Sequence, residues 1–198
     1  MTKKLIALTL LAAVSVACGC APTLYSDVPL IWKPTNDLYS GSPTLTGMYS
    51  EKFRVLPFVD LRSSKKEIAK NVEGSREKPV TTKDDVAMWC TDRFKTIIKQ
   101  YGLTVVDNQE TVTLKGEILN FYVTEDNLYR SNVGIRLTAE DPKGKVLWQG
   151  LITGNAKRFG RSYSLENYYE SISDAYLEAV SGWLNNQEFK NALSQKLR

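Results

Sequence analysis

The sequence contains no histidine among its 198 residues. A Ser-His-Asp triad, a Cys-His pair and a histidine-ligated zinc site all need an imidazole, so all three are excluded. The motifs GxSxG, CxxC and GxxxxGK[ST] are missing as well. Carboxylates occur at 125, 126, 140 and 141, but their spacing does not indicate a catalytic pair. We therefore expect a protein that is not an enzyme and that has no cofactor and no metal ion.

The positive charge is also not concentrated in a long basic run. The formal net charge is +4, from 26 basic and 22 acidic residues. A nucleic-acid-binding domain gathers its basic residues into a patch or stripe, so no nucleic-acid partner is expected. Hydrophobic residues make up 42% and charged residues 24%, as in globular proteins. The length suits a single folded domain with an additional segment.

Cysteine is scarce, and two of the three cysteines, Cys18 and Cys20, follow an apolar run near the N-terminus. The run, Leu5–Val16, comes after Lys3 and Lys4. It is shorter than the about 20 apolar residues that cross a membrane and has the length of a signal-peptide core. A signal followed by small residues and a cysteine resembles the lipobox of bacterial lipoproteins. In that family the signal is cut immediately before the cysteine, which is then acylated.

Either cysteine fits the lipobox. Cys20 is favoured as the lipidated residue because Gly19 precedes it and a segment rich in Pro, Thr and Ser follows; Cys18 is the alternative. A plain secretory signal with incidental cysteines is a further alternative. Acyl chains such as palmitate would form a stable anchor, since each buried CH₂ contributes about 0.8 kcal/mol. Ala21 rather than Asp follows Cys20, which by resemblance to lipoprotein sorting implies the periplasmic face of the outer membrane.

The chain divides into three expected parts. Residues 1–19 form the signal peptide, 20–50 a lipidated cysteine with a tether rich in Pro, Ser and Thr, and 51–198 a single periplasmic domain. The tether carries Leu30, Ile31 and Trp32, which we expect to pack on the chain's own domain in preference to a partner. The third cysteine, Cys90, falls in a helical pattern and is expected to be buried and inert.

Hydrophobic periodicity predicts an α+β fold. Strands are predicted at 52–60, 103–106, 111–124, 133–137 and 146–153, with 61–82 and 125–132 as connections. Helices are predicted from a cap at Thr81 or Thr82 to Gly102, after a cap at Ser164, and near 189–197. The order β-α-β-β-β-β-α-α predicts a two-layer sandwich, a mainly antiparallel sheet with helices packed on one face.

Two basic stretches are candidate binding regions. The first, residues 61–83, contains Lys65, Lys66 and Arg76, and the second, residues 154–161, contains Lys157, Arg158 and Arg161. Solvated loops are the simpler interpretation, and contact with anionic lipid headgroups is the functional one.

A charged pair also follows the first predicted strand. Asp60 and Arg62, two residues apart, form either a structural ion pair or a polar-ligand site. The structural interpretation is favoured because exposed pairs are common.

Taken together, these segments resemble the YajG-type family of bacterial lipoproteins. The resemblance rests on GCAP at the lipobox, VDLR after the first strand, YGLTVV at the helix-to-strand corner, two hairpins, ISDAYLEAVSGWL and EFKNAL. It implies a periplasmic α+β domain tethered to the outer membrane, without an established activity.

The function expected from the sequence is a non-enzymatic binding or assembly role in the cell envelope. The partners would be the outer membrane, through the lipid anchor, and an envelope protein or lipid. One alternative is a carrier or sensor of a lipid or glycan that uses the sheet face left open by the helices, hinted at by Phe121, Tyr122 and Val123. A less favoured alternative is an envelope hydrolase that uses carboxylates.

Overall fold

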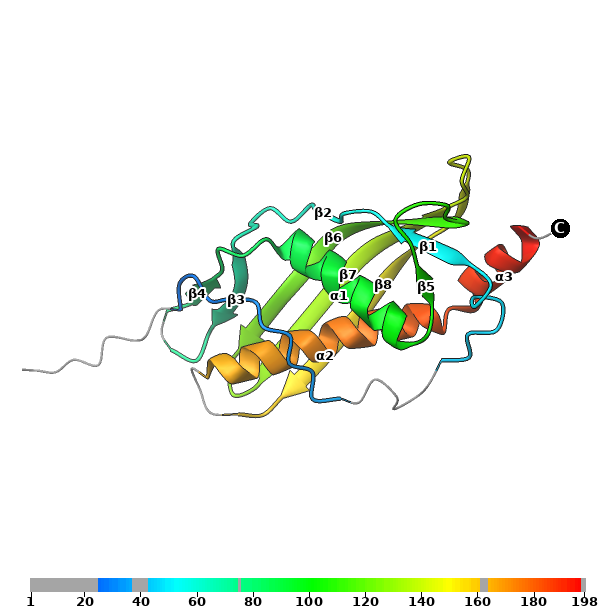
Figure 1. The fold of residues 1–198 in the computed structure, drawn as a ribbon. Helices are drawn as coiled ribbons and strands as arrows, with labels where there is room; N and C mark the ends of the chain where they lie inside the picture. The colour runs from blue at the N-terminus through cyan, green and yellow to red at the C-terminus, as the bar shows by residue number, and fades with distance from the viewer. Residues whose placement is uncertain (1–24, 37–42, 75, 161–163, 197–198) are drawn as a thin grey trace, which may run out of the picture.

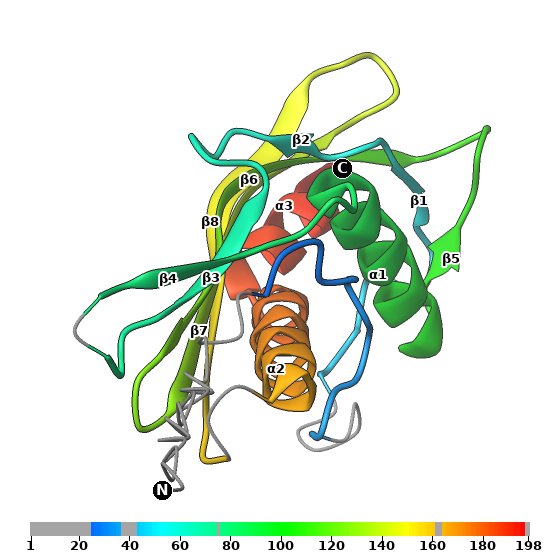
Figure 2. The same cartoon turned by 90° about the vertical axis from the view of Figure 1, so that its left-hand side faces the viewer.

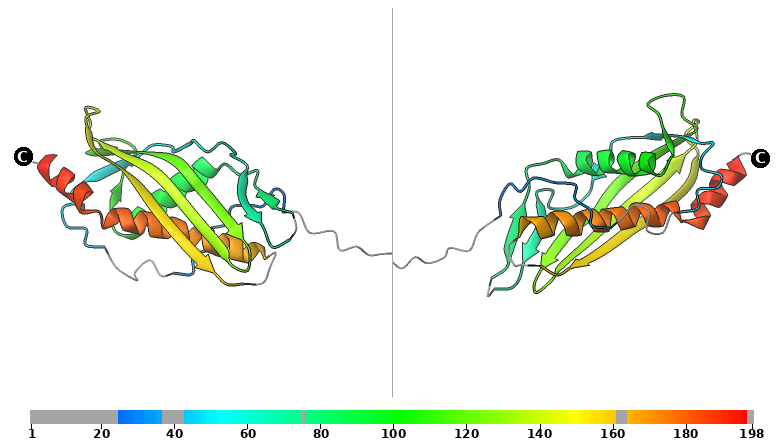
Figure 3. Two further views of the ribbon diagram at one scale, coloured as in Figure 1. Left: turned by 180° about the vertical axis from the view of Figure 1, so that it is seen from behind. Right: turned by 60° about the horizontal axis from the view of Figure 1, so that its bottom comes forward.

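In the described part of the chain, three helices lie on one face of a curved sheet of eight strands (Figure 1; Figure 2). The computed structural model describes residues 25–36, 43–74, 76–160 and 164–196. No helix of these residues covers the other face of the sheet (Figure 3). The fold class expected from the sequence, an α+β two-layer sandwich, is confirmed.

The long strand β6 (Val112–Glu125) organises the sheet. On one side it pairs antiparallel along its length with β7 (Tyr129–Glu140), and β7 pairs with β8 (Val146–Arg158), which forms the sheet edge. On the other side it pairs in turn with three short parallel strands, which are β1 (Lys52–Val55), β2 (Val59–Asp60) and β3 (Glu67–Asn71). Outside these lie two more short strands, β4 (Lys78–Thr81) and β5 (Thr104–Val105).

The predicted strand at 52–60 is divided in the structure into β1 and β2. Pro57 lies between them and has no backbone N–H to donate to the ladder. The prediction of a loop at 61–82 is wrong, because this range contains the β3–β4 hairpin. Ile68 and Ala69 are buried in β3, where Glu67 and Lys70 are charged. Short charged strands at a sheet edge give little periodic signal, so they read as a loop.

The helices are α1 (Val86–Gln100), α2 (Leu165–Leu184) and α3 (Gln187–Lys196). Helix α1 is capped by Asp85, whose carboxylate accepts a hydrogen bond from Met88 N at 3.0 Å, and not by Thr81 or Thr82 as expected. It ends as predicted before Gly102, whose φ of +86° suits the position after a helix. Within the described residues, no helix is long and apolar enough to cross a membrane.

The N-terminal segment 25–36 lies along the helix layer. Its start is held beside β4, where Val28 N donates to Thr81 O at 2.8 Å and Thr81 N donates to Tyr25 O at 3.0 Å. Further on, the Trp32 ring lies 5.8 Å from that of Trp89 and 6.3 Å from that of Tyr176. The expectation that Trp32 packs on its own domain is therefore confirmed. Part of the expected tether is a component of the core.

Helix α2 packs very closely on β8, and a glycine permits this approach. A Cβ built on Gly154 would lie 1.9 Å from the carbonyl oxygen of Ala175 and 2.5 Å from the nitrogen of Ala179. Any larger residue would therefore push the helix away from the strand. This contact fixes the position of α2 along the sheet edge, where a groove of about 520 Å³ is found.

Candidate functional site

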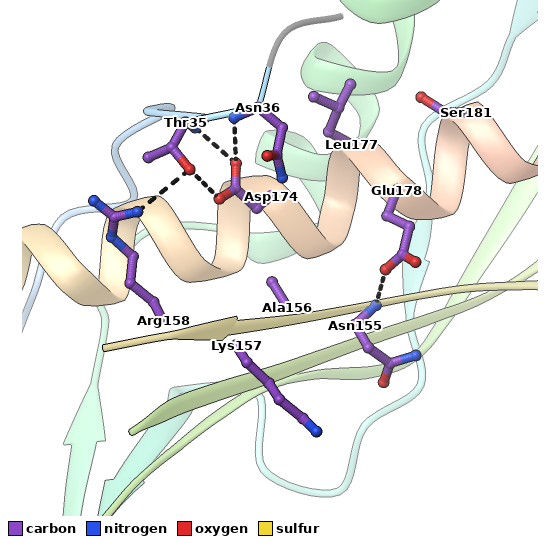
Figure 4. A pocket seen from close by; sticks show the side chains of 10 residues that line it. All are labelled: Thr35, Asn36, Asn155, Ala156, Lys157, Arg158, Asp174, Leu177, Glu178 and Ser181. Atoms are coloured by element: carbon purple, nitrogen blue, oxygen red, sulfur yellow. Dashed lines mark hydrogen bonds between the residues drawn. The ribbon is translucent and has the colours of Figure 1, made fainter. Parts of the chain in front are cut away.

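A groove of about 520 Å³ lies between helix α2 and the outer edge of β8 (Figure 4). One wall is formed by residues 155–158 of β8, and the other by α2 from Asp174 to Ser181. Thr35 and Asn36 of the N-terminal segment close one end. Three segments that are far apart in the sequence therefore build it.

The strand wall of the groove exposes main-chain groups. Among the described residues, β8 pairs only with β7, so its other side has no strand partner. The N–H of Asn155 points into the groove and donates to a Glu178 carboxylate oxygen at 2.5 Å. Main-chain direction alternates along a strand, so the N–H and C=O groups of Thr153 and Lys157 face the same way. Glu178 thus occupies one of three positions at which another strand could pair.

The charged side chains on the helix side of the groove compensate one another. Arg158 forms an ion pair with Glu170, and its Nη1 also lies 3.4 Å from Thr35 Oγ1. Asp174 accepts hydrogen bonds from Thr35 N at 2.7 Å and from Asn36 N at 3.2 Å. These pairs hold the end of the groove in place and leave little net charge in it.

The six basic residues singled out from the sequence do not form one site. Lys157 and Arg158 lie on the groove strand, but on opposite faces of it, because successive side chains alternate (Figure 4). Arg158 points toward α2, and Lys157 points away from the helix into solvent. Arg161, like Cys18 and Cys20, lies outside the described residues.

The basic residues of the 61–83 stretch lie elsewhere. Lys65 and Lys66 are exposed in the bend before β3 and line a separate groove of about 390 Å³ at the start of α1, together with Lys83, Asp84 and Asp85. Arg76 is exposed in the turn between β3 and β4. Their role in binding stays a prediction.

Asp60 and Arg62 form the structural pair favoured by the sequence. Arg62 Nη2 lies 2.8 Å from Asp60 Oδ2, and its Nε lies 3.0 Å from Asp60 Oδ1. The two side chains are 8% and 7% exposed. Arg62 also donates to the carbonyl oxygens of Glu67, Phe121 and Lys65. The guanidinium therefore closes the loop before β3 and is not free to bind a ligand.

Glu125, one of the carboxylates noted in the sequence, is fully buried. It accepts hydrogen bonds from the hydroxyls of Tyr129, at 2.8 Å, and Tyr168. Burial, helped by the carboxylate, raises the pKa of Tyr168 strongly, and burial raises that of Tyr129 to about 12. The three groups form a hydrogen-bonded network inside the core, to which Ser164 N contributes by donating to the Tyr129 hydroxyl at 3.1 Å. Within the described residues, no cluster of acidic or cysteine side chains is suited to hold a metal ion.

The uncovered face of the sheet is polar. Its centre carries a row of amides, in which Asn120 Nδ2 donates to Asn132 Oδ1 and Asn132 Nδ2 donates to Asn155 Oδ1, the latter at 2.6 Å. Tyr122 lies in the same register row as Asn132. This face offers hydrogen bonds to a ligand, and large exposed apolar side chains are few on it, among them Leu119 and Leu151.

The groove and its acidic residues are not predicted by any pattern considered in the sequence. Asp174 and Glu178 are four residues apart in the run ISDAYLEAV, where the remaining residues are mostly apolar. The signal that could have indicated a polar site is the pair of acids on one side of an otherwise buried helix. The partners of these acids are backbone groups of distant segments, which no local pattern reveals.

The fold is similar to solved structures at low sequence identity. A protein of family DUF330 from Xanthomonas campestris aligns over 88% of this chain and 99% of its own, with 10% identity and a TM-score of 0.59. The PelC dodecamer from Paraburkholderia phytofirmans aligns over 68% and 86%, with 12% identity and a TM-score of 0.42. Lipoprotein GNA1162 from Neisseria meningitidis aligns over 59% and 90%, with 11% identity and a TM-score of 0.36.

The first of these likenesses shows a shared fold, and the other two are too distant to support an argument about this chain. No protein-family model matches the sequence, and no curated protein matches it. Membership of the YajG-type family stays a prediction.

Proposed function

We propose that the protein is a non-enzymatic lipoprotein, anchored by Cys20 in the outer membrane and facing the periplasm, that binds an extended segment of an envelope protein. The sequence supports the anchor through the signal run and the lipobox. The observation that carries the binding role is the open edge of β8 beside a groove of about 520 Å³. An extended peptide adds to such an edge by main-chain hydrogen bonds.

The incoming segment would pair with the main-chain groups of Thr153, Asn155 and Lys157. In the free protein Glu178 accepts from the Asn155 N–H and thereby blunts the edge. Glu178 is exposed, so a bound strand can replace it at Asn155 while its carboxylate turns into water. The side chains of the bound segment would alternate between the groove and the uncovered sheet face.

A binding role also agrees with the state of the polar groups in the groove. Its two carboxylates, Asp174 and Glu178, are both engaged with backbone N–H groups. A general base has to reach a proton on a substrate, and neither group is placed for that before it gives up its present partner.

The anchor is tested by the intact mass of the protein purified from membranes, beside Cys20→Ser and Cys18→Ser variants. We expect the Cys20→Ser variant to stay uncleaved and unacylated while Cys18→Ser matures normally. The reverse result would assign the anchor to Cys18. Release of both variants as soluble, unacylated proteins would contradict the lipoprotein proposal.

The groove is tested by a proline at the strand edge. The Thr153 N–H faces away from β7, so Thr153→Pro should preserve the sheet while it removes one donor and blocks strand addition. Thr153→Val keeps the N–H and is the matched control. We expect an envelope protein that crosslinks to the β8 edge to be lost from the proline variant and retained by the valine variant. Equal crosslinking of both folded variants would contradict the proposal.

A second candidate function is binding of a glycan on the uncovered sheet face. The amide row of Asn120, Asn132 and Asn155, with Tyr122 in register beside it, favours a polar ligand over a lipid on this face. Titration with soluble envelope glycan fragments tests it. Heat of binding that Asn132→Ala removes would support this role, and no heat with either protein would exclude it for those glycans.

A further inference from the structure

The described chain begins at the same end of the domain where β8 ends. The Tyr25 ring lies 6.2 Å from that of Tyr168, which lies 4.9 Å from that of Tyr129. Tyr129 is paired directly with Arg158, the last residue of β8. Figure 2 looks onto this end, where the β3–β4 and β6–β7 turns also come forward. Contacts thus connect the start of the segment to the residue that precedes Phe159.

Phe159 is 83% exposed, the highest value among the exposed large apolar side chains of the described residues. It is the first residue after β8, which ends at Arg158. An aromatic ring exposed to this extent costs free energy in water, and single apolar residues of this kind are favourable at the boundary between lipid headgroups and acyl chains.

Cationic side chains also lie at this end of the sheet. One register row crosses four strands of the sheet and places Lys70, Arg130 and Lys157 on the uncovered face, with Thr124 of β6 between the first two. Lys70 is paired with Glu77 and Arg130 with Asp126. Within the described part of the chain, no salt bridge is found for Lys157 or for Arg76, which lies in the β3–β4 turn at the same end of the sheet but toward its other edge. These two exposed groups can contact anionic headgroups. Each contact would add to the free energy of membrane binding, as basic residues near an anionic membrane surface do.

We propose that this end of the domain is a second membrane contact, in which Phe159 inserts into the headgroup boundary while Lys157 and Arg76 face anionic lipid. The inference rests on the lipid anchor of the proposed function. Cys20 is five residues before Tyr25, and five residues span at most about 17 Å. The anchor therefore holds this end, and not the opposite one, at the bilayer surface.

A tryptophan that reports contact with lipid tests the proposal. The full-length lipoprotein, purified from membranes, is reconstituted into vesicles of phosphatidylethanolamine and phosphatidylglycerol whose acyl chains are brominated near the headgroup. The Phe159→Trp variant is compared with Tyr49→Trp, and the fluorescence of the unmodified protein is subtracted. Bromine quenches an indole only at close contact, so the assay distinguishes an inserted ring from one that is merely near the membrane.

Tyr49 is a matched control because it is exposed, aromatic and remote. It is 61% exposed and packs beside Gly102 at the end of α1. The adjacent Tyr101 hydroxyl lies 3.1 Å from Ser181 Oγ, near the C-terminal end of α2. Tyr168 is near the other end of that helix, and thirteen helical residues separate the two sites by about 20 Å.

We expect the emission of the Phe159→Trp variant to shift to shorter wavelength in vesicles and to be quenched by brominated lipid, with neither effect for Tyr49→Trp. Equal quenching of the two variants, or none for Phe159→Trp, would overturn the membrane contact. The mass of the acylated protein and its flotation with vesicles are recorded on the same samples. Loss of acylation and flotation would overturn the anchor and with it this inference, so the two failures are distinguishable.

Discussion

Asp174 Oδ1 on helix α2 lies 2.7 Å from the backbone nitrogen of Thr35, a residue 139 positions earlier in the chain. The same carboxylate accepts from Thr35 Oγ1 at 2.5 Å and from Asn36 N at 3.2 Å. One side chain thus attaches the N-terminal segment to the helix layer. Because this attachment also closes the end of the groove beside β8, the stability of the segment and the shape of the groove depend on the same contacts.

Asp174→Ala should therefore destabilise the whole domain. Asp174 is 7% exposed, so its removal leaves backbone donors without a charged acceptor, at a cost of about 2–3 kcal/mol. Urea denaturation measures this change in the free energy of unfolding. Glu188→Ala, at an exposed position of α3, should change it by less than about 0.5 kcal/mol. Equal values for the two variants would contradict the attachment.

Two glycine substitutions should change the stability of the domain in opposite directions. Gly154→Ala places a methyl group against the backbone of Ala175 and Ala179, and overpacking of this kind costs about 1–3 kcal/mol or more. Gly182→Ala meets no atom within 4 Å and should stabilise helix α2 by about 0.4–1 kcal/mol. Thermal unfolding of both variants checks the signs. A neutral Gly154→Ala would show that α2 does not pack against β8 as closely as described.

Arg62→Ala should lower the free energy of unfolding much more than the removal of an exposed arginine. It breaks a buried pair with Asp60 and leaves that carboxylate without its partner, which costs about 3–5 kcal/mol. Arg54, whose side chain is 44% exposed, pairs with Glu110 at 3.1 Å, and Arg54→Ala should cost no more than about 1 kcal/mol. The difference is measured by urea denaturation of both variants. Similar losses would mean that the Asp60–Arg62 pair is not a structural element.

Stability should fall at alkaline pH. Burial raises the pKa of Cys90 and of Tyr176 well above their ordinary values, and raises that of Tyr129 to about 12. Between the ordinary values, about 8.5 for Cys and 10 for Tyr, and the raised ones, the unfolded chain releases protons that the folded protein keeps. The unfolded state then binds fewer protons, so the free energy of unfolding decreases as pH rises.

The Tyr168→Phe variant provides the control for this dependence. The pKa of Tyr168 is raised by burial and by Glu125, so its removal should make the decline shallower, although the variant is less stable at neutral pH. Urea denaturation at pH about 8 and about 10.5 measures both slopes. An unchanged slope would mean that Tyr168 ionises as easily in the folded protein as in the unfolded one.

The elements best predicted from the sequence are those with a strong local period. The strand predicted at 111–124 is observed at Val112–Glu125, and the helix ending before Gly102 is observed with its cap glycine. Strand β8 is longer than its predicted range of 146–153. Its last residues alternate between Lys157 in solvent and Arg158 against the helix layer, and two cations in succession conceal the period.

The sequence by itself determined the central meander of β6, β7 and β8 and the two long helices, because one-sided burial leaves a period in the chain. Only the tertiary structure decided that the segment 25–36 crosses the helix layer, that β3 and β4 complete the sheet, and that β8 is left as an open edge. These features depend on contacts such as Thr35 with Asp174 and Gly154 with Ala175, each between segments far apart in sequence. A local pattern shows that a residue is buried, and only the folded chain shows what buries it.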